Sequence, residues 1–359
     1  MAGFLTERFS VSLPKYFRAF RPPELLDFQM PHLAGTLTVR IPPKSSHISI
    51  AELRYIYVQN QQPHYEPKDE IYNSNHLTQS STLKSASRFL TYNMTVYNIN
   101  PETHLNVVSS GSGTGPTLIY LHYWGGSSRT FAPLISNLPQ FPAIAIDFRG
   151  WGDSTGPHVA TEYSNLNLAL DVEILIEKLG IHDFILVGHS MGGKVAQLIG
   201  GRHRVPGLRA IVLIGPAPPT PLVLPPDVKA QQMTAYDSAE SCEFVARNIL
   251  TSSSLSDEQI KIVVEDNLKG NQFAKLAWPT YAILEDILIE TKKIDVPVLV
   301  IAGELDKIDP IERHQKEVVD NLSIAEMVVV KGSGHLLPVE APVQVAKHIA
   351  EFVTKLAVV

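Results

Sequence analysis

The chain has 359 residues, of which 44% are hydrophobic and 18% are charged, and its formal net charge is −6 at pH 7. This length and apolar fraction are sufficient for one large core with an inserted segment. The acidic balance, together with the lack of a basic stretch interleaved with aromatic residues, gives no reason to expect nucleic-acid binding. No apolar run approaches the length of a membrane span, so we expect no membrane-spanning segment.

The cysteine content and the first residues bear on the compartment. A single cysteine, Cys242, excludes a disulfide within the chain and fits a reducing environment. Residues 1–8 lack the apolar core of a secretory signal peptide. Arg8 and Lys15 are compatible with an organellar transit peptide, whereas Glu7 and several nearby prolines argue against one. We therefore expect a cytoplasmic protein, with an organellar transit peptide as the alternative.

Residues 1–90 differ in pattern from the rest of the chain. They contain Pro-Pro pairs and polar stretches such as residues 59–63, and they show little sustained periodicity. This composition predicts an N-terminal extension with little packed structure. One strand is expected within it, at residues 48–57, and we expect no catalytic residue there.

From residue 91 onward, short apolar runs typical of strands alternate with helical patterns, which predicts a mostly parallel sheet flanked by helices on both faces. The first two strands, at 91–98 and 104–108, are expected to form an antiparallel hairpin. Apolar residues recur at helical spacing in 166–179 and in 338–356, and both segments are predicted to be packing helices. In the first, the expected packing positions are Leu166, Leu170, Ile174 and Leu175. Six further strands are expected at 118–122, 143–148, 184–188, 210–214, 298–302 and 326–330.

The alternation stops between residues 216 and 294. The segment opens on Pro-Ala-Pro-Pro-Thr-Pro, and its later part has helical patterns at 256–266 and 275–291. We predict a helical cap at 216–294, inserted into a core made of residues 91–215 and 295–359. Trp278 and Tyr281 are candidate substrate contacts within the cap, although packing alone is the more common role of such a residue.

Residues 184–194 read Phe-Ile-Leu-Val-Gly-His-Ser-Met-Gly-Gly-Lys, an apolar run followed by a glycine-rich turn and a helix-compatible segment. Gly-x-Ser-x-Gly between a strand and a helix is typical of a nucleophile elbow, which holds a strained serine at the tip of a tight turn. Positions two before and two after the serine must be small, and Gly188 and Gly192 meet that demand. A plain glycine-rich turn is the alternative. The strand and helix on either side favour Ser190 as a nucleophile.

Two later loops supply partners for this serine. Residues 303–310 follow a predicted strand and contain Asp306, the candidate acid. Glu304 and Asp309 are its rivals, but Glu304 lies close to the strand end, and Asp309 precedes Pro310, where we expect it to cap a helix. His335 lies in a glycine-rich loop after the last predicted strand. The order serine, acid, histidine is the one expected when a Gly-x-Ser-x-Gly serine is the nucleophile.

Residues 122–128 read His-Tyr-Trp-Gly-Gly-Ser-Ser and form the candidate oxyanion loop. We expect one backbone N–H from Trp124 or its neighbour and a second from Met191, so that two donors converge on a developing negative charge. His122 is expected to be structural. Tyr123 and Trp124 are also candidate substrate-binding residues.

Together four segments resemble the α/β-hydrolase superfamily: the loop at 122–128, residues 147–154 (Asp-Phe-Arg-Gly-Trp-Gly-Asp-Ser), the Gly-His-Ser-Met-Gly-Gly elbow, and the loops of Asp306 and His335. The chain looks most similar to the branch of serine esterases and non-haem perhydrolases or haloperoxidases. The resemblance implies an α/β-hydrolase fold and a Ser190–His335–Asp306 triad that needs no cofactor and no metal. Relatives that place an aspartate at the nucleophile position, such as epoxide hydrolases, are disfavoured by Ser190.

The expected function is a serine hydrolase that cleaves a carboxylic ester, or a related acyl bond, of a small organic substrate through an acyl-enzyme on Ser190. A cofactor-free perhydrolase or haloperoxidase, a C–C hydrolase and a lyase are alternatives that would use the same triad. A non-catalytic ligand-binding receptor is a further alternative. The sequence indicates neither the natural substrate nor the oligomeric state.

Overall fold

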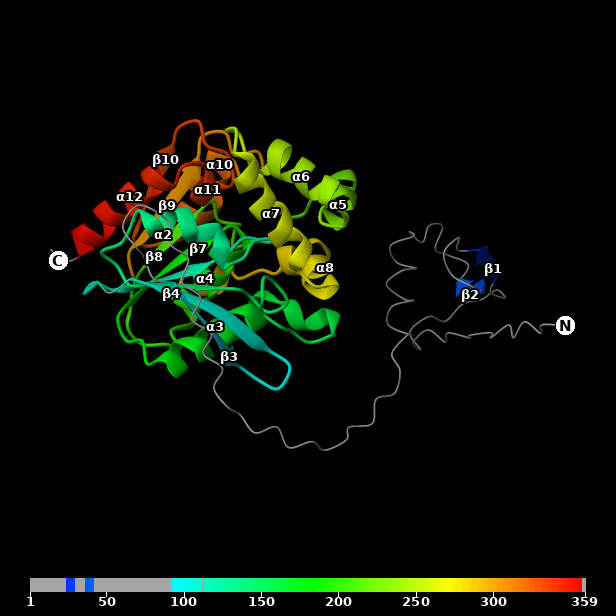
Figure 1. Ribbon diagram of the computed structural model, residues 1–359, viewed down its shortest axis with the longest axis horizontal. Coiled ribbons are helices and arrows are strands. Elements are labelled where there is room, and N and C mark those ends of the chain that lie inside the picture. Colours follow the sequence, from blue (N-terminus) through cyan, green and yellow to red (C-terminus); the bar gives the residue numbers. More distant parts are fainter. Residues whose placement is uncertain (1–23, 30–35, 42–91, 112, 357–359) are drawn as a thin grey trace. The chain divides into compact units, whose positions relative to one another are not determined.

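The computed structural model describes residues 24–29, 36–41, 92–111 and 113–356, which fall into two units, Met1–Asn75 and His76–Val359 (Figure 1). In the first unit, β1 (Glu24–Gln29) pairs with β2 (Thr36–Ile41) as antiparallel strands. The strand expected at 48–57 lies outside the described residues. The three-part division of the chain remains a prediction.

An eight-stranded sheet organises the second unit, in the order β10-β9-β8-β7-β5-β6-β4-β3. Neighbouring strands from β10 to β6 are parallel, whereas β4 pairs antiparallel with both β6 and β3. The mostly parallel sheet and its antiparallel hairpin are therefore as the sequence predicts. The strands are β3 (Asn93–Asn98), β4 (His104–Ser110), β5 (Thr117–Leu121), β6 (Ala143–Ile146), β7 (Phe184–His189), β8 (Leu208–Ile214), β9 (Val298–Gly303) and β10 (Ala325–Val330).

Helices cover both faces of this sheet because the central strands are apolar on both sides. On β5, Ile119 and Leu121 belong to the core cluster that contains the buried faces of α3 (Asn165–Leu179) and α4 (Met191–Arg202). Leu118 and Tyr120 point to the other face, where they join α2 (Ala132–Ser136) and α12 (Pro342–Leu356). This alternation follows the two-residue period of a strand and fixes its register between the two helix layers.

Helix α3 is close to its predicted bounds, but its expected apolar face is only partly buried. Leu175 is buried as expected and Leu166 is 42% exposed, whereas Leu168 and Val172, which were not among the expected positions, are buried. The helix begins after Ser164, whose side chain accepts a hydrogen bond from Asn167 N. It ends at Gly180, which adopts a left-handed conformation.

The C-terminal helix predicted at 338–356 is two helices, α11 (Leu337–Glu340) and α12. The break falls at Ala341, directly before Pro342. A residue that precedes proline is disfavoured in the α conformation, which accounts for the interruption. The apolar face of α12 still packs on the sheet as expected, with Val345, Ile349 and Phe352 buried.

Residues 216–294, the predicted cap, are mostly helical, and helices α5, α6, α7 and α8 lie together beside one end of the sheet (Figure 1). The single helix expected at 275–291 is wrong: α8 starts earlier, because Asn271 caps it, and ends just after Pro279. The cap elements are α5 (Pro226–Met233), α6 (Ala239–Val245), η3 (Ala246–Leu250), α7 (Asp257–Lys269), α8 (Gln272–Thr280), η4 (Ala282–Leu284) and α9 (Leu288–Thr291).

Short helical turns complete the unit, at η1 (Ser128–Phe131), η2 (Ala160–Tyr163), α10 (Ile311–Arg313), η5 (His314–Val318) and η6 (Val319–Asn321). None of the helices in the described ranges is both long enough and apolar enough to cross a membrane.

Candidate active site

Ser190 lies between the end of β7 and the first residue of α4, in a strained backbone conformation. Its φ of 54° and ψ of −115° belong to a region that side-chain-bearing residues rarely occupy. Its N–H donates to the Ile214 carbonyl oxygen at 3.0 Å, which ties the turn to the neighbouring strand β8. This strand–turn–helix arrangement is the geometry of a nucleophile elbow.

The glycines around Ser190 are required by space. A Cβ atom on Gly188 would collide with the carbonyl oxygen of Gly192, and one on Gly192 would collide with that of Leu121. A Cβ on Gly193 would approach the Cβ of Pro216 to 2.8 Å. The turn can close because these glycines have no Cβ, so neighbouring segments of the chain can pack directly against the backbone of the turn.

Asp306 and His335 form a buried pair near the elbow. The distance between His335 Nδ1 and Asp306 Oδ2 is 2.7 Å, and both side chains are almost fully buried. The other carboxylate oxygen of Asp306 accepts hydrogen bonds from the N–H groups of Ile308 and Asp309, at 2.8 and 3.0 Å. These contacts orient the carboxylate, so that one oxygen is held by the backbone and the other faces the imidazole.

The two residues shift each other's ionisation in opposite directions. Burial alone would lower the pKa of His335, but the charge and hydrogen bond of Asp306 raise it above the ordinary value. Burial alone would raise the pKa of Asp306, but His335 and the two backbone N–H groups hold it below the ordinary value. The pair therefore favours an ionised Asp306 that stabilises positive charge on His335.

The rival carboxylates are engaged elsewhere. Glu304 accepts a hydrogen bond from Gly332 N at 2.8 Å. Asp309 accepts one from Arg313 Nη1 at 2.9 Å, and its burial raises its pKa to about 6. The expectation that Asp309 caps a helix is wrong, because Pro310 is the N-cap of α10 and no side chain caps that helix. Asp309 instead bonds to a residue within the helix.

The buried pair and Ser190 lie at the same edge of the sheet. A Cβ built on Gly215, one residue past the acceptor of the Ser190 N–H, would lie 3.4 Å from Asp306 Oδ2 and 3.5 Å from His335 Nδ1. The ring of His189 lies 5.2 Å from that of His335, and its Nε2 is 2.7 Å from the His335 carbonyl oxygen. The His335–Asp306 pair thus lies close to the strand ends that carry Ser190 and the acceptor of its N–H.

The loop at 122–128 follows β5 at this edge. His122 Nε2 accepts from Phe148 N at 3.0 Å, so Nδ1 carries the proton and donates to the Tyr123 carbonyl oxygen at 2.7 Å. Burial lowers the pKa of His122 to about 4, which keeps the ring neutral at physiological pH. His122 is a structural residue in this geometry, consistent with the expectation. Met191, the other candidate donor, is the first residue of α4, where helical N–H groups have no intrahelical acceptor.

The candidate substrate-binding residues are placed differently from one another. Tyr123 and Trp124 are buried in the oxyanion loop, and the indole Nε1 of Trp124 donates to the Lys275 carbonyl oxygen at 3.1 Å. Trp278 is buried in the core cluster that includes α3 and α4. The hydroxyl of Tyr281 is occupied by the η2 turn, since it accepts from Tyr163 N and donates to the carbonyl oxygen of Ala160.

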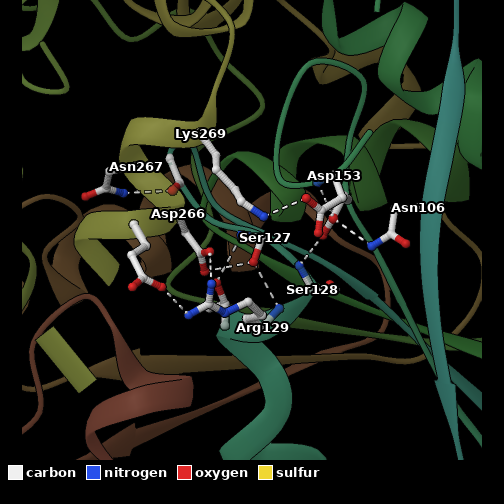
Figure 2. A network of polar contacts seen from close by, with 12 residues as sticks. Asn106, Ser127, Ser128, Arg129, Asp153, Asp266, Asn267 and Lys269 are labelled. Carbon is white, nitrogen blue, oxygen red and sulfur yellow. Dashed lines mark hydrogen bonds and ion pairs between the residues drawn. The ribbon is translucent and has the colours of Figure 1, made fainter. Parts of the chain in front are cut away.

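A polar network joins the oxyanion loop to cap helix α7. Figure 2 shows Asp266 of α7 facing Ser127 and Arg129, with Ser127 Oγ 2.8 Å from Asp266 Oδ2 and Arg129 Nη1 3.2 Å from Asp266 Oδ1. Asn267 donates to the Gly125 carbonyl oxygen at 2.7 Å. The sequence interpretation missed both cap residues, because nothing in a polar pair on a helix indicates which distant loop it contacts.

Among the residues that the structure describes, no group of three or more histidine, cysteine or acidic side chains has a metal-binding arrangement. A serine, a histidine and a carboxylate are the residue types that serine hydrolases use for acyl transfer.

Comparison with known proteins agrees with this geometry. The α/β-hydrolase-fold family matches residues 116–256. The AB hydrolase superfamily protein YisY of Bacillus subtilis is 26% identical to this chain, and the match covers 71% of this chain and 97% of YisY. The carboxylesterase YbfK of the same organism is 29% identical, and the match covers 70% of this chain and 84% of YbfK. The crystal structure of a bromoperoxidase from Bacillus anthracis superposes with a TM-score of 0.66 at 19% identity, covering 73% of this chain and 99% of that one. The chain has the α/β-hydrolase fold and is an enzyme.

Proposed function

We propose that this enzyme is a serine hydrolase that cleaves carboxylic esters of small organic substrates, with Ser190 as nucleophile, His335 as general base and Asp306 as the acid that orients His335. The observation that carries the proposal is the buried His335–Asp306 pair beside a serine held at positive φ. The similarity to a carboxylesterase supports the choice of an ester substrate.

The proposed reaction has two steps. His335 takes the hydroxyl proton of Ser190 as its oxygen attacks the ester carbonyl, and the imidazolium then gives that proton to the departing alcohol. Water attacks the acyl-enzyme, again with proton transfer to His335, and releases the carboxylic acid and the free serine. The N–H groups of Met191 and the Trp124 loop stabilise the oxyanion of both tetrahedral intermediates.

The test is hydrolysis of p-nitrophenyl acetate, butyrate and octanoate by the full chain and by Ser190→Ala. Ser136→Ala is the matched control, because it also removes one hydroxyl but lies on α2 and donates only to the Pro133 carbonyl oxygen. We expect Ser190→Ala to lower kcat by on the order of 10⁶-fold, and Ser136→Ala to leave it unchanged. Equal turnover by the wild type and Ser190→Ala would rule out the proposal, as would peroxide-dependent halogenation without ester hydrolysis.

A further inference from the structure

Three successive carbonyl groups of the oxyanion loop each accept a hydrogen bond from a side chain, and the cap supplies two of the three donors. The Tyr123 carbonyl is held by His122, within the loop itself. The Trp124 carbonyl accepts from the Tyr236 hydroxyl at 2.9 Å, and the Gly125 carbonyl accepts from Asn267 Nδ2 at 2.7 Å. The donors from the cap are more than 100 residues distant in sequence, with separations of 112 and 142 residues.

Holding a carbonyl also sets the direction of an N–H group. In a planar trans peptide the C=O and the following N–H point in opposite directions, so a side chain that fixes one fixes the other. Tyr236 therefore sets the N–H of Gly125, and Asn267 sets that of Gly126. The second of these N–H groups already donates to the Tyr123 carbonyl at 2.9 Å, so Asn267 stabilises the turn that carries the Trp124 amide.

The loop requires this support because Gly125 and Gly126 carry no side chains that could fix them. Gly125 has a φ of 100°, a conformation that glycine adopts readily and leaves as readily. Without an external donor the peptides on either side could rotate, and their N–H groups would lose a fixed direction. Two donors on a packed helical cap remove that freedom.

Both cap residues are themselves held rigidly. Tyr236 is buried, and its ring lies 4.3 Å from that of Trp124 and 6.3 Å from that of Trp151. Asn267 is fully buried on α7, next to the Asp266 contacts with Ser127 that are drawn in Figure 2. The hydrogen bonds of Tyr236 and Asn267 thus join packed elements.

We propose that Tyr236 and Asn267 are positioning residues that orient the oxyanion loop, so that cap and core together form the oxyanion hole. This inference rests on the proposed function, because it assumes that the loop stabilises an oxyanion at Ser190. Neither residue touches the reacting atoms. Tyr236 sets the direction of the Gly125 N–H, and Asn267 holds the turn that carries the Trp124 N–H, so that a donor of this loop is already in place when charge develops on the oxyanion.

The experiment compares two variants with two matched controls in the full chain. Tyr236→Phe removes the buried hydroxyl that donates to the Trp124 carbonyl oxygen. Its control, Tyr163→Phe, removes a buried hydroxyl that donates to the Pro157 carbonyl oxygen at 2.7 Å. Asn267→Leu removes a buried side-chain amide that donates to the Gly125 carbonyl oxygen at 2.7 Å. Its control, Asn165→Leu, removes a buried side-chain amide that donates to the Ala282 carbonyl oxygen, also at 2.7 Å. Each control breaks the same kind of bond away from the oxyanion loop, and also a second one, because Asn271 donates to the Tyr163 hydroxyl at 2.8 Å and Asn165 donates to Glu285 at 2.9 Å.

Two rates are measured: kcat and KM for p-nitrophenyl butyrate, and the rate at which a fluorophosphonate modifies the protein, since its phosphoryl oxygen takes the place of the oxyanion. We expect both variants to lower kcat and the phosphonylation rate by on the order of 10- to 100-fold, less than the roughly 10²- to 10³-fold cost of removing a donor outright. KM should change less than about threefold. The controls should stay within about threefold of the wild type in both rates.

The outcomes separate this inference from the proposed function. An active wild type with Tyr236→Phe and Asn267→Leu equal to their controls would overturn the inference alone. An equal loss in all four variants would also overturn it, because it would show a general effect of lost buried hydrogen bonds. A wild type that neither hydrolyses the ester nor reacts with the fluorophosphonate would overturn both proposals. If Asn267→Leu does not fold, Tyr236→Phe, which keeps the ring packing, decides alone.

Discussion

The two loops that meet at Ser190 take their shapes from different parts of the chain. The elbow is determined within its own neighbourhood: Gly188, Gly192 and Gly193 let backbone segments approach where a Cβ would collide. The oxyanion loop, in contrast, is oriented in part by Tyr236 and Asn267 from the cap. A turn built on close approach can be recognised in a short stretch of sequence, whereas a loop held by distant donors can be understood only from the folded chain.

The largest effect is expected from a variant of the histidine–acid pair that alters neither the elbow nor the oxyanion loop. Asp306→Asn keeps a side chain of the same shape but removes the charge that orients and stabilises His335. We expect kcat to fall by about 10⁴-fold, with thermal unfolding close to that of the wild type. Steady-state ester hydrolysis and a melting curve measure the two effects. A loss of less than tenfold would show that Asp306 is not the acid of the triad.

The local origin of the elbow is tested by adding one methyl group. Gly192→Ala would place a Cβ against the carbonyl oxygens of Leu121 and His122, and we expect the free energy of unfolding to fall by about 3 kcal/mol. Gly180→Ala is the control: its φ is 63° but nothing lies within 4 Å of the added Cβ, so only backbone strain of about 1 kcal/mol is expected. Urea unfolding monitored by tryptophan fluorescence compares the two. Equal losses would show that the neighbouring backbone shifts to admit a Cβ at position 192, so that space does not make glycine necessary there.

The same distinction explains what could be predicted from the sequence. The strands and Ser190, Asp306 and His335 follow from apolar runs and from glycine-rich loops at their ends, and the structure places these three side chains at one sheet edge. The apolar face of α3 was only partly predicted: Leu175 is buried as expected and Leu166 is exposed, because two overlapping sets of apolar residues share helical spacing and only the packing against the sheet selects one. Tyr236 and Asn267 could not be found, since their partners are backbone carbonyls, which leave no signal in the sequence.

The pH dependence separates the histidine–acid pair from the oxyanion loop. His335 must be neutral to accept a proton, and Asp306 raises its pKa, so kcat/KM should increase with pH through a midpoint above the ordinary histidine value of 6.5. Asp306→Asn should move this midpoint to lower pH. Tyr236→Phe should lower the plateau and leave the midpoint in place, because Tyr236 contacts the Trp124 carbonyl and not His335. A shifted midpoint in Tyr236→Phe would indicate that the cap acts through the histidine.

The smallest expected effect concerns an exposed contact between the same cap helix and the core. Lys269 of α7 pairs with Asp153 at 2.6 Å, close to the network that holds the oxyanion loop (Figure 2), but the two side chains are 40% and 55% exposed. An ion pair at such a site contributes less than about 1 kcal/mol, because water screens it and two long side chains must be ordered to form it. We therefore expect Lys269→Ala to change the unfolding free energy by less than that amount and to leave kcat unaltered. A fall in the kcat of Lys269→Ala as large as the one expected for Asn267→Leu would show that any contact between α7 and the core is sufficient to orient the oxyanion loop. The buried donors Tyr236 and Asn267 would then have no special role.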